Sequence, residues 1–250
     1  MARIVVPDVP HHVTQRGNRR QPVFFSSADC QAYLRLMATW CAEQQVEVWA
    51  YCLMPNHVHL VAVPHTEAGL ARAIGEAHRR YTVRVNQRES WRGYLFQGRF
   101  ASCPLDEHYL LAAVRYVELN PLRAGLAERA WQYPWSSARA HVSGSDDRLV
   151  KVKPMLERVS DWRDYLGAGI ETVESDIIRR HLRTGRPLGD QAFVELLEAK
   201  TGRTLAPRKR GRKPGAPAAR PKWYYVPDIP MSPIYRAEFR CPSSLAVVQL

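Results

Sequence analysis

Two histidines, His57 and His59, are the first residues in this chain whose type and spacing could do chemistry. They open an apolar run after Pro55-Asn56, and such a run is typical of a β-strand. Side chains two residues apart on a strand point to the same face, roughly 7 Å apart along the backbone. Two imidazoles placed in this way can converge on one metal ion, or they can occupy the solvent-facing side of a hairpin. Because polar rings on a half-buried strand cost stability unless they have a partner, the pair indicates function.

A second pair, Tyr116 and Asn120, lies in a helix predicted over 106–120. Residues four apart share one helix face. Asn120 offers an amide oxygen to a hard cation, and Tyr116 offers a phenol that could attack phosphorus beside that cation. Two histidines and one oxygen ligand with open positions suit a catalytic Mg²⁺ or Mn²⁺ ion better than a closed structural zinc site. Tyr109 is the rival nucleophile on this helix, but Ala113 stands at its i+4 position.

Other polar side chains near these motifs have less reactive interpretations. His11 and His12 lie at the edge of the first predicted strand, and we expect them at the surface. Glu118 projects away from the Tyr116 face of its helix, where we expect a solvated role. Tyr81 follows an apolar helical stripe and is predicted to be a core residue. We therefore place none of them in the reaction.

The strongly basic charge balance favours a polyanionic partner, most simply nucleic acid. The formal net charge is +12 and the pI is near 9.8. The segment 201–227 holds eight basic residues and no acidic one. Basic residues also follow one stripe of the predicted helix 67–88, although such a stripe can equally be a solvated face. The residues expected to contact DNA are Arg16, Arg19, Arg20, Arg80, Arg84, Arg208, Lys209, Arg210, Arg212 and Lys213.

Composition also limits where the chain can act. No run of 18 apolar residues is present, so we expect no membrane span and no membrane partner. Residues 1–8 lack the apolar core of a signal peptide. The five cysteines are scattered without C-x-x-C spacing, which argues against a disulfide framework or a zinc finger and favours a reducing compartment. We therefore expect a cytoplasmic, nucleoid-associated protein that is a monomer or a homodimer.

The elements that must position these residues follow from hydrophobic periodicity. The pattern predicts alternating strands and helices, with strands at 12–16, 46–54, from 57 onward and at 94–103, and helices at 27–45, 67–88 and 106–120. This order favours a ferredoxin-like α+β fold, in which helices cover an antiparallel sheet. Pro55-Asn56 then forms the hairpin turn that places the histidine strand beside its predecessor.

The chain changes character after the last of these helices. We divide it into a main domain at 1–140, a helical extension at 141–200 and a basic tail at 201–250. The extension contains predicted helices at 171–183 and 190–200, which could form a DNA-binding pair. The tail has no hydrophobic periodicity and is predicted to be disordered.

Several of these segments resemble one family. His57-Val58-His59 resembles the HUH motif (histidine, hydrophobic residue, histidine) of the HUH nuclease superfamily. The lead-in Met54-Pro55-Asn56, the block 97–100 and the block 116–125 are similar to the single-tyrosine (Y1) transposases of the IS200/IS605 type. Further similarity in the segments 14–21 and 184–189 points to the REP-associated tyrosine transposases, a chromosomal offshoot of that group. The resemblance spans about residues 10–210.

The resemblance implies a ferredoxin-like nuclease domain, a divalent metal, and single-stranded DNA that folds into short palindromic hairpins as the substrate. Tyr116 would be the nucleophile, forming a 5′-phosphotyrosine link and leaving a free 3′-hydroxyl. His57, His59 and Asn120 would be the metal ligands. The protein would therefore be a site-specific endonuclease and strand transferase.

Other functions remain open at this point. A non-cleaving, sequence-specific DNA-binding protein derived from a transposase would keep the fold and lose the reaction, but intact Tyr116, His57 and His59 argue against it. A phosphodiesterase with paired H-x-T/S motifs needs two such motifs, and one histidine pair stands out here. Rolling-circle replication initiators share the histidine motif but usually have longer chains with other domains.

Overall fold

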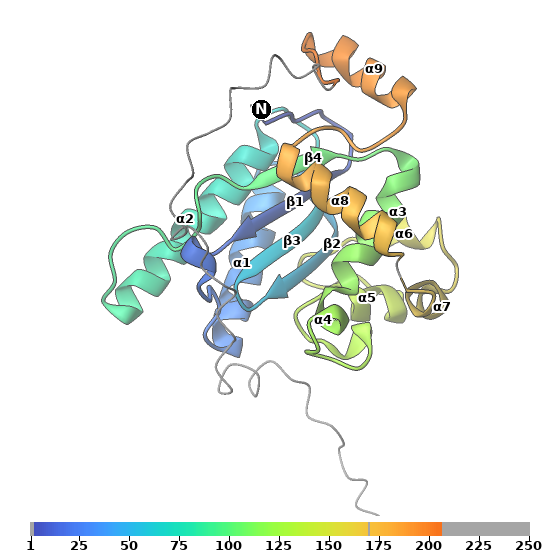
Figure 1. Cartoon of the computed structure of the whole chain (residues 1–250). Helices are drawn as coiled ribbons and strands as arrows, with labels where there is room; N and C mark the ends of the chain where they lie inside the picture. The colour runs from blue at the N-terminus through green and yellow to red at the C-terminus, as the bar shows by residue number, and fades with distance from the viewer. Residues whose placement is uncertain (1–2, 170, 207–250) are drawn as a thin grey trace, which may run out of the picture.

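A four-stranded antiparallel sheet forms the centre of the protein (Figure 1). The computed structural model describes residues 3–169 and 171–206. The strands run in the order β2-β3-β1-β4, and each neighbouring pair is antiparallel. Two helices join them in the chain order β1-α1-β2-β3-α2-β4, which is the ferredoxin-like topology and confirms the predicted fold class. The strands are β1 His11–Arg16, β2 Val46–Met54, β3 His57–Pro64 and β4 Ala101–Pro104.

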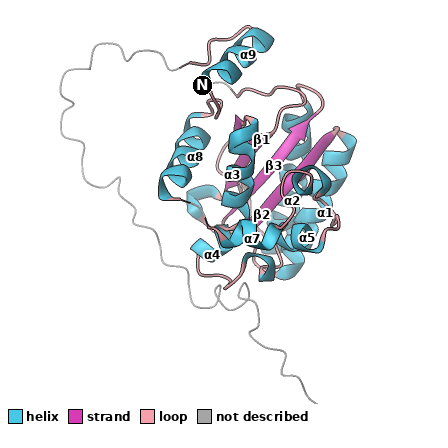
Figure 2. Ribbon diagram, turned by 90° about the vertical axis from the view of Figure 1, so that its right-hand side faces the viewer, coloured by secondary structure: helices cyan, strands magenta, loops and turns pink. Residues whose placement is uncertain are grey.

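Helices cover both faces of the sheet (Figure 2). On one face α1 (Ser27–Glu43) packs against α2 (Gly69–Glu89), and on the other α3 (Glu107–Glu118) packs on β2 and β3. On that second face α8 (Thr172–Thr184) contacts α3, β1 and β4. Because both faces are covered, β3 is buried along almost its whole length rather than on alternate residues. The other described helices are α4 Asn120–Arg123, α5 Ala138–Ser143, α6 Lys153–Leu156, α7 Trp162–Gly167 and α9 Gln191–Thr201, with 3₁₀ turns η1 Asn18–Arg20 and η2 Ala130–Gln132.

The strand and the helix predicted nearest to Tyr116 have different bounds in the structure. The strand predicted over 94–103 was wrong for most of its length, because β4 begins at Ala101. Gly93 and Gly98 have φ values of 97° and 58°, in the left-handed region, so the backbone before β4 turns instead of extending. The helix predicted over 106–120 ends at Glu118, and the chain then enters α4, which has Pro121 in its first turn, where a helix tolerates proline.

One hydrophobic core extends from the sheet into the helical extension. Tyr81 of α2 is fully buried, as predicted, and its ring contacts those of Phe24, Tyr33 and Phe96. On the other face the Tyr133 hydroxyl donates to the Leu53 carbonyl (2.7 Å). Trp162 and Ile178 belong to the same buried cluster, so side chains on both sides of residue 140 share this core. None of the described helices is long and apolar enough to cross a membrane.

Glu118 contradicts its predicted solvated role, because its side chain is fully buried. Its carboxylate accepts hydrogen bonds from Ser137 Oγ (2.5 Å), His141 Nδ1 (2.7 Å) and Trp162 Nε1 (2.8 Å). These donors come from α5, α7 and the residue before α5, none of which the sequence pattern predicted. The extension therefore covers a helix face that the sequence pattern left open to solvent. Glu118 ties α3 to that extension.

Candidate active site

The β2–β3 hairpin places His57 and His59 on one face of the sheet, as predicted. Their ring centroids lie 5.0 Å apart. The register pairs His57 with Arg16 on the neighbouring strand β1. The ring of His59 lies 5.7 Å from the ring of Tyr116, so the pair faces α3. The two predicted motifs therefore meet on the same side of the sheet.

Asn56, the residue before the motif, determines which nitrogen of His57 is free. Its Oδ1 lies 2.6 Å from His57 Nδ1, and an amide oxygen can only accept, so Nδ1 carries the proton. The Asn56 amide nitrogen donates to the Arg20 carbonyl (3.1 Å), which is consistent with this orientation of the amide. His57 Nε2 consequently keeps its lone pair. This hydrogen bond gives the Pro55-Asn56 turn a role beyond reversing the chain.

His12 is a site residue that the sequence analysis missed, since it is fully buried and not at the surface as expected. Its Nε2 lies 3.0 Å from His59 Nδ1, and its ring lies 5.8 Å from that of Tyr116. If His59 Nδ1 donates in this hydrogen bond, His59 Nε2 is free to bind a cation. His12 Nδ1 is buried without a partner among the described residues. His11 is buried as well, with its Nδ1 2.7 Å from the Val9 carbonyl oxygen.

Burial favours the neutral form of all three site histidines. Desolvation lowers the pKa of His57 to about 3, with further contributions from Arg16 and Arg123. It also lowers the pKa of His12 to about 3, and Arg123 adds to the effect. The pKa of His59 is lowered well below its usual value by burial and then by the neighbouring histidines. At neutral pH each ring therefore keeps a lone pair on one nitrogen, and this is the form that binds metals.

α3 carries Tyr116 to the histidines. Asp106 caps this helix by accepting from the Tyr109 amide (2.8 Å). Tyr116 lies near the end of the helix and is 6% exposed, with the Arg123 guanidinium 3.9 Å above its ring centroid. The ring of Tyr109 lies 4.9 Å from that of His108. Tyr116, and not its predicted rival Tyr109, is thus the tyrosine in ring contact with the histidine motif.

Asn120 begins α4, one helical turn after Tyr116. Its amide nitrogen is buried and has no hydrogen-bond partner among the described residues, whereas a cation would be bound by the amide oxygen. No group of three or more His, Cys, Asp or Glu side chains in the described part of the chain could hold a metal ion. A cation held by His57 and His59 would therefore need oxygen from Asn120 or from water. Such a donor set, with open positions, fits Mg²⁺ or Mn²⁺.

The arginines predicted to bind DNA divide between different parts of the structure. Arg16 lies beside His57, and Arg19 and Arg20 follow in an exposed turn with φ values of 52° and 62°. Arg80 and Arg84 are exposed on α2, in the layer across the sheet from Tyr116. The Arg80 guanidinium lies 4.7 Å from the ring centroid of Trp40 and 3.6 Å from a carboxylate oxygen of Glu76. The predicted contacts of the tail, Arg208, Lys209, Arg210, Arg212 and Lys213, lie outside the described residues.

Residues 5–120 match the family described as IS200-like transposases. The chain carries an IS200-like transposase domain. No curated protein matches the chain in sequence. Among solved structures, a REP-associated tyrosine transposase bound to a REP hairpin matches with a TM-score of 0.51 and 17% identity, over 61% of this chain and 92% of that one. A putative transposase from Deinococcus radiodurans R1 is 23% identical over 47% of this chain and 95% of that one, with a TM-score of 0.32.

The matched segment contains the whole sheet together with His57, His59, Tyr116 and Asn120. The match confirms the predicted likeness to IS200-type transposases over residues 5–120, and the likeness to the REP-bound structure supports the fold. Arg123 and α8 lie after the matched segment.

Proposed function

We propose that this transposase cuts and rejoins single-stranded DNA at hairpin elements through a covalent tyrosine intermediate. The observation that carries the proposal is the contact between Tyr116 and the histidines. The rings of His59 and His12 lie 5.7 and 5.8 Å from the Tyr116 ring, and His57 is adjacent. A phenol beside neutral, metal-seeking imidazoles is suited to attack a phosphodiester.

The reaction is a transesterification at one phosphorus. The Tyr116 oxygen forms a bond to phosphorus while the bond from phosphorus to the 3′-oxygen breaks, and the phenol proton is transferred, directly or through water, to that leaving oxygen. The products are a 5′-phosphotyrosine on the protein and a free 3′-hydroxyl on the other fragment. Because the new bond is again a phosphodiester, a 3′-hydroxyl can reverse the step or direct it to a different strand. No outside oxidant or energy source is required.

Within this proposal His57 and His59 would hold the divalent cation, and Asn120 would supply an oxygen ligand. A bound Mg²⁺ or Mn²⁺ would stabilise negative charge on the phosphate oxygens. Asn56 keeps the His57 lone pair available by accepting from Nδ1. Burial disfavours the protonated form of both histidines, which would otherwise repel the cation.

The proposed substrate is a REP-like DNA hairpin with single-stranded DNA beside it. The solved transposase of similar fold is bound to a REP hairpin. The net charge of +12 provides the electrostatic attraction that any polyanion needs. Arg19 and Arg20 lie in the turn that Asn56 links to His57, so a strand reaching the histidines would pass these charges. They are proposed to contact the phosphate backbone.

A covalent adduct with DNA tests the proposal directly. The wild-type chain would be incubated with Mn²⁺ and hairpin DNA labelled on the 5′ or the 3′ side of the cut, and then run on a denaturing gel. The label should stay with the protein from the 3′-side fragment alone. Tyr116→Phe should abolish both cleavage and adduct, and the matched variant Tyr109→Phe should keep both.

Two outcomes would overturn the proposal. An adduct formed by Tyr116→Phe would assign the nucleophile to another residue. Tight hairpin binding by the wild-type chain without any cleavage would instead identify a non-cleaving DNA-binding protein derived from a transposase.

A further inference from the structure

The short helix α4 turns the chain back towards Tyr116. It runs from Asn120 to Arg123 and packs on β2. Gly125, which has a φ of 65° in the left-handed region, follows the end of this helix and lets the chain leave it sharply. Asn120 and Arg123 are three residues apart, so they lie on the same side of this single helical turn. The candidate oxygen ligand and a cationic side chain therefore share one short element.

Arg123 makes two contacts with Tyr116. Its guanidinium lies 3.9 Å from the ring centroid, where a cation is attracted to the aromatic face, and its Nη2 donates to the Tyr116 carbonyl (3.0 Å). The first contact involves the side chain of the tyrosine, and the second involves its backbone. The rings of His59 and His12 lie 5.7 and 5.8 Å from the same Tyr116 ring. The tyrosine therefore contacts both the histidine cluster and a guanidinium.

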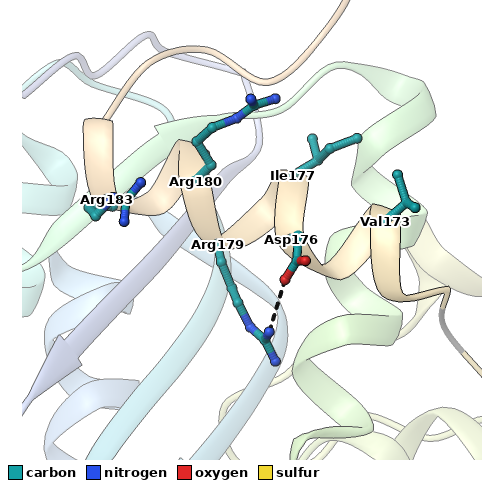
Figure 3. Close-up of a pocket in the computed structure, with 6 residues that line it drawn as sticks. All are labelled: Val173, Asp176, Ile177, Arg179, Arg180 and Arg183. Atoms are coloured by element: carbon teal, nitrogen blue, oxygen red, sulfur yellow. Dashed lines mark hydrogen bonds and ion pairs between the residues drawn. The ribbon is translucent and has the colours of Figure 1, made fainter.

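The charge of Arg123 is available to an anion. Arg123 is exposed, and within the described part of the chain no carboxylate lies within ion-pair distance of it. Arg179 of α8, on the same face of the sheet, differs in this respect: it lines a hollow of about 650 Å³ and forms an ion pair with Asp176 (3.1 Å; Figure 3). A guanidinium has five N–H donors in a fork that matches phosphate oxygens. Arg123 thus keeps donors for a phosphate while Tyr116 holds it in place.

We propose that Arg123 is a catalytic residue, whose guanidinium fixes the Tyr116 ring and donates to a non-bridging oxygen of the scissile phosphodiester. The inference rests on the proposed tyrosine reaction and adds to it a residue that lies after the matched segment 5–120. α4 would then present an oxygen ligand for the cation at Asn120 and a positive charge for the phosphate at Arg123.

The role of Arg123 follows from where charge builds during the transfer. The Tyr116 oxygen forms its bond to phosphorus while the bond from phosphorus to the 3′-oxygen breaks, and the phenol proton goes to that leaving oxygen, directly or through water. Negative charge builds on the non-bridging oxygens, and a guanidinium already held in position stabilises it without reorganising. Arg123 stays protonated throughout, so it neither gives nor takes a proton.

The test compares Arg123→Ala with Arg115→Ala. Arg115 makes the same two kinds of contact with other partners: its guanidinium lies 4.1 Å from the ring centroid of Tyr165, and its Nη1 donates to the Gly169 carbonyl (2.9 Å). Single-turnover cleavage of a hairpin oligonucleotide is measured with Mn²⁺, and hairpin affinity is measured separately by fluorescence anisotropy. Arg123→Ala should cleave about 10²–10³-fold more slowly, the typical effect of removing one donor to a developing oxyanion, while its affinity changes much less. Arg115→Ala should cleave like the wild type.

A sulfur substitution shows whether Arg123 touches the phosphate. The hairpin is prepared with a phosphorothioate at the cut, as separate Rp and Sp diastereomers, and is cleaved with Mn²⁺, which accepts sulfur as a ligand. Because sulfur is a poorer hydrogen-bond acceptor than oxygen, one diastereomer should slow the wild type and lose that effect in Arg123→Ala. Arg123→Lys, which keeps the charge without the fork, should have an intermediate cleavage rate and a smaller sulfur effect. Thermal melting checks the fold of each variant, and Arg123→Lys carries the comparison if the alanine variant does not fold.

The possible failures are separable. If the wild-type chain cleaves and Arg123→Ala cleaves equally well, the role of Arg123 is overturned and the proposed function stands. A sulfur effect that is absent from the wild type, or equally large in the variant, overturns the phosphate contact. An equal loss of rate in Arg115→Ala would show that cleavage depends on the packing of α3 and not on Arg123. If the wild-type chain forms no adduct, the proposed function fails and this inference fails with it.

Discussion

Replacing Glu118 with alanine should destabilise the protein strongly, although sequence periodicity places this residue on a solvent-facing side of its helix. Glu118 is fully buried, and its carboxylate accepts from Ser137, His141 and Trp162. Alanine would leave these donors without an acceptor in a dry environment. Each buried unsatisfied group costs about 1–3 kcal/mol, and partial access of water to the cavity reduces the sum. We therefore expect a loss of roughly 3–5 kcal/mol in the free energy of unfolding.

A glutamine at the same position separates hydrogen bonding from volume. Glu118→Gln keeps the size of the side chain and one acceptor oxygen, but it turns the second acceptor into a donor. The amide would then face either Trp162 Nε1 or the Ser137–His141 pair, donor against donor. The expected loss is about 1–3 kcal/mol, between wild type and alanine. Glu128→Ala is the matched control, because Glu128 is exposed and its removal should change stability by less than about 0.5 kcal/mol.

Urea unfolding followed by circular dichroism measures these differences, and thermal melting provides an independent scale. For a chain of this size each kcal/mol lowers Tm by about 2–4 °C, so Glu118→Ala should melt roughly 6–20 °C below wild type. Hydrogen exchange should also rise in α5 and α7, whose side chains lose their anchor on α3. If Glu118→Ala unfolds within about 1 kcal/mol of wild type, the buried network does not hold the extension.

Four further predictions follow from the site and the charge distribution. His57→Ala should still bind hairpin DNA in a mobility assay but should lose cleavage. EDTA should abolish cleavage by the wild type, and added Mg²⁺ or Mn²⁺ should restore it. Full cleavage activity in EDTA would contradict the metal assignment. His12→Ala should weaken Mn²⁺ binding measured by calorimetry about 10- to 100-fold, because His59 loses the partner that orients it; unchanged affinity would refute that role. Burial lowers the pKa of His78 from 6.5 to about 3, so the unfolded chain takes up a proton that the folded state resists, and the stability present above pH 6.5 is lost as the pH falls towards 3. His78→Gln should therefore reduce the slope of the unfolding free energy against pH in this range by about one proton. A slope equal to that of the wild type would contradict this role of His78. Deleting residues 207–250 should weaken binding to all DNA sequences by a similar factor. The slope of log K (the association constant) against the logarithm of the salt concentration should become shallower by about 0.7 for each single-strand phosphate that the tail neutralises in the wild type. An unchanged slope would show that the tail binds no phosphate.

Local spacing was enough to predict the fold class and the two reactive motifs. Alternation along a strand places His57 and His59 on one face, and an i to i+4 relation places Tyr116 and Asn120 one helical turn apart. The order of strands and helices restricts the topology further, which is why the ferredoxin-like fold could be recognised. The surface positions of exposed arginines such as Arg19 also follow from a polar loop composition.

Tertiary packing decided the surroundings of those motifs. His12 meets His59 across 47 residues of sequence because β1 pairs with β3 in one register, and that register depends on the burial of both faces of the sheet. Glu118 became a buried anchor because helices of the extension dock on α3. Periodicity describes which face of an element is apolar, whereas the partner of that face is selected by shape and burial between segments far apart in the chain.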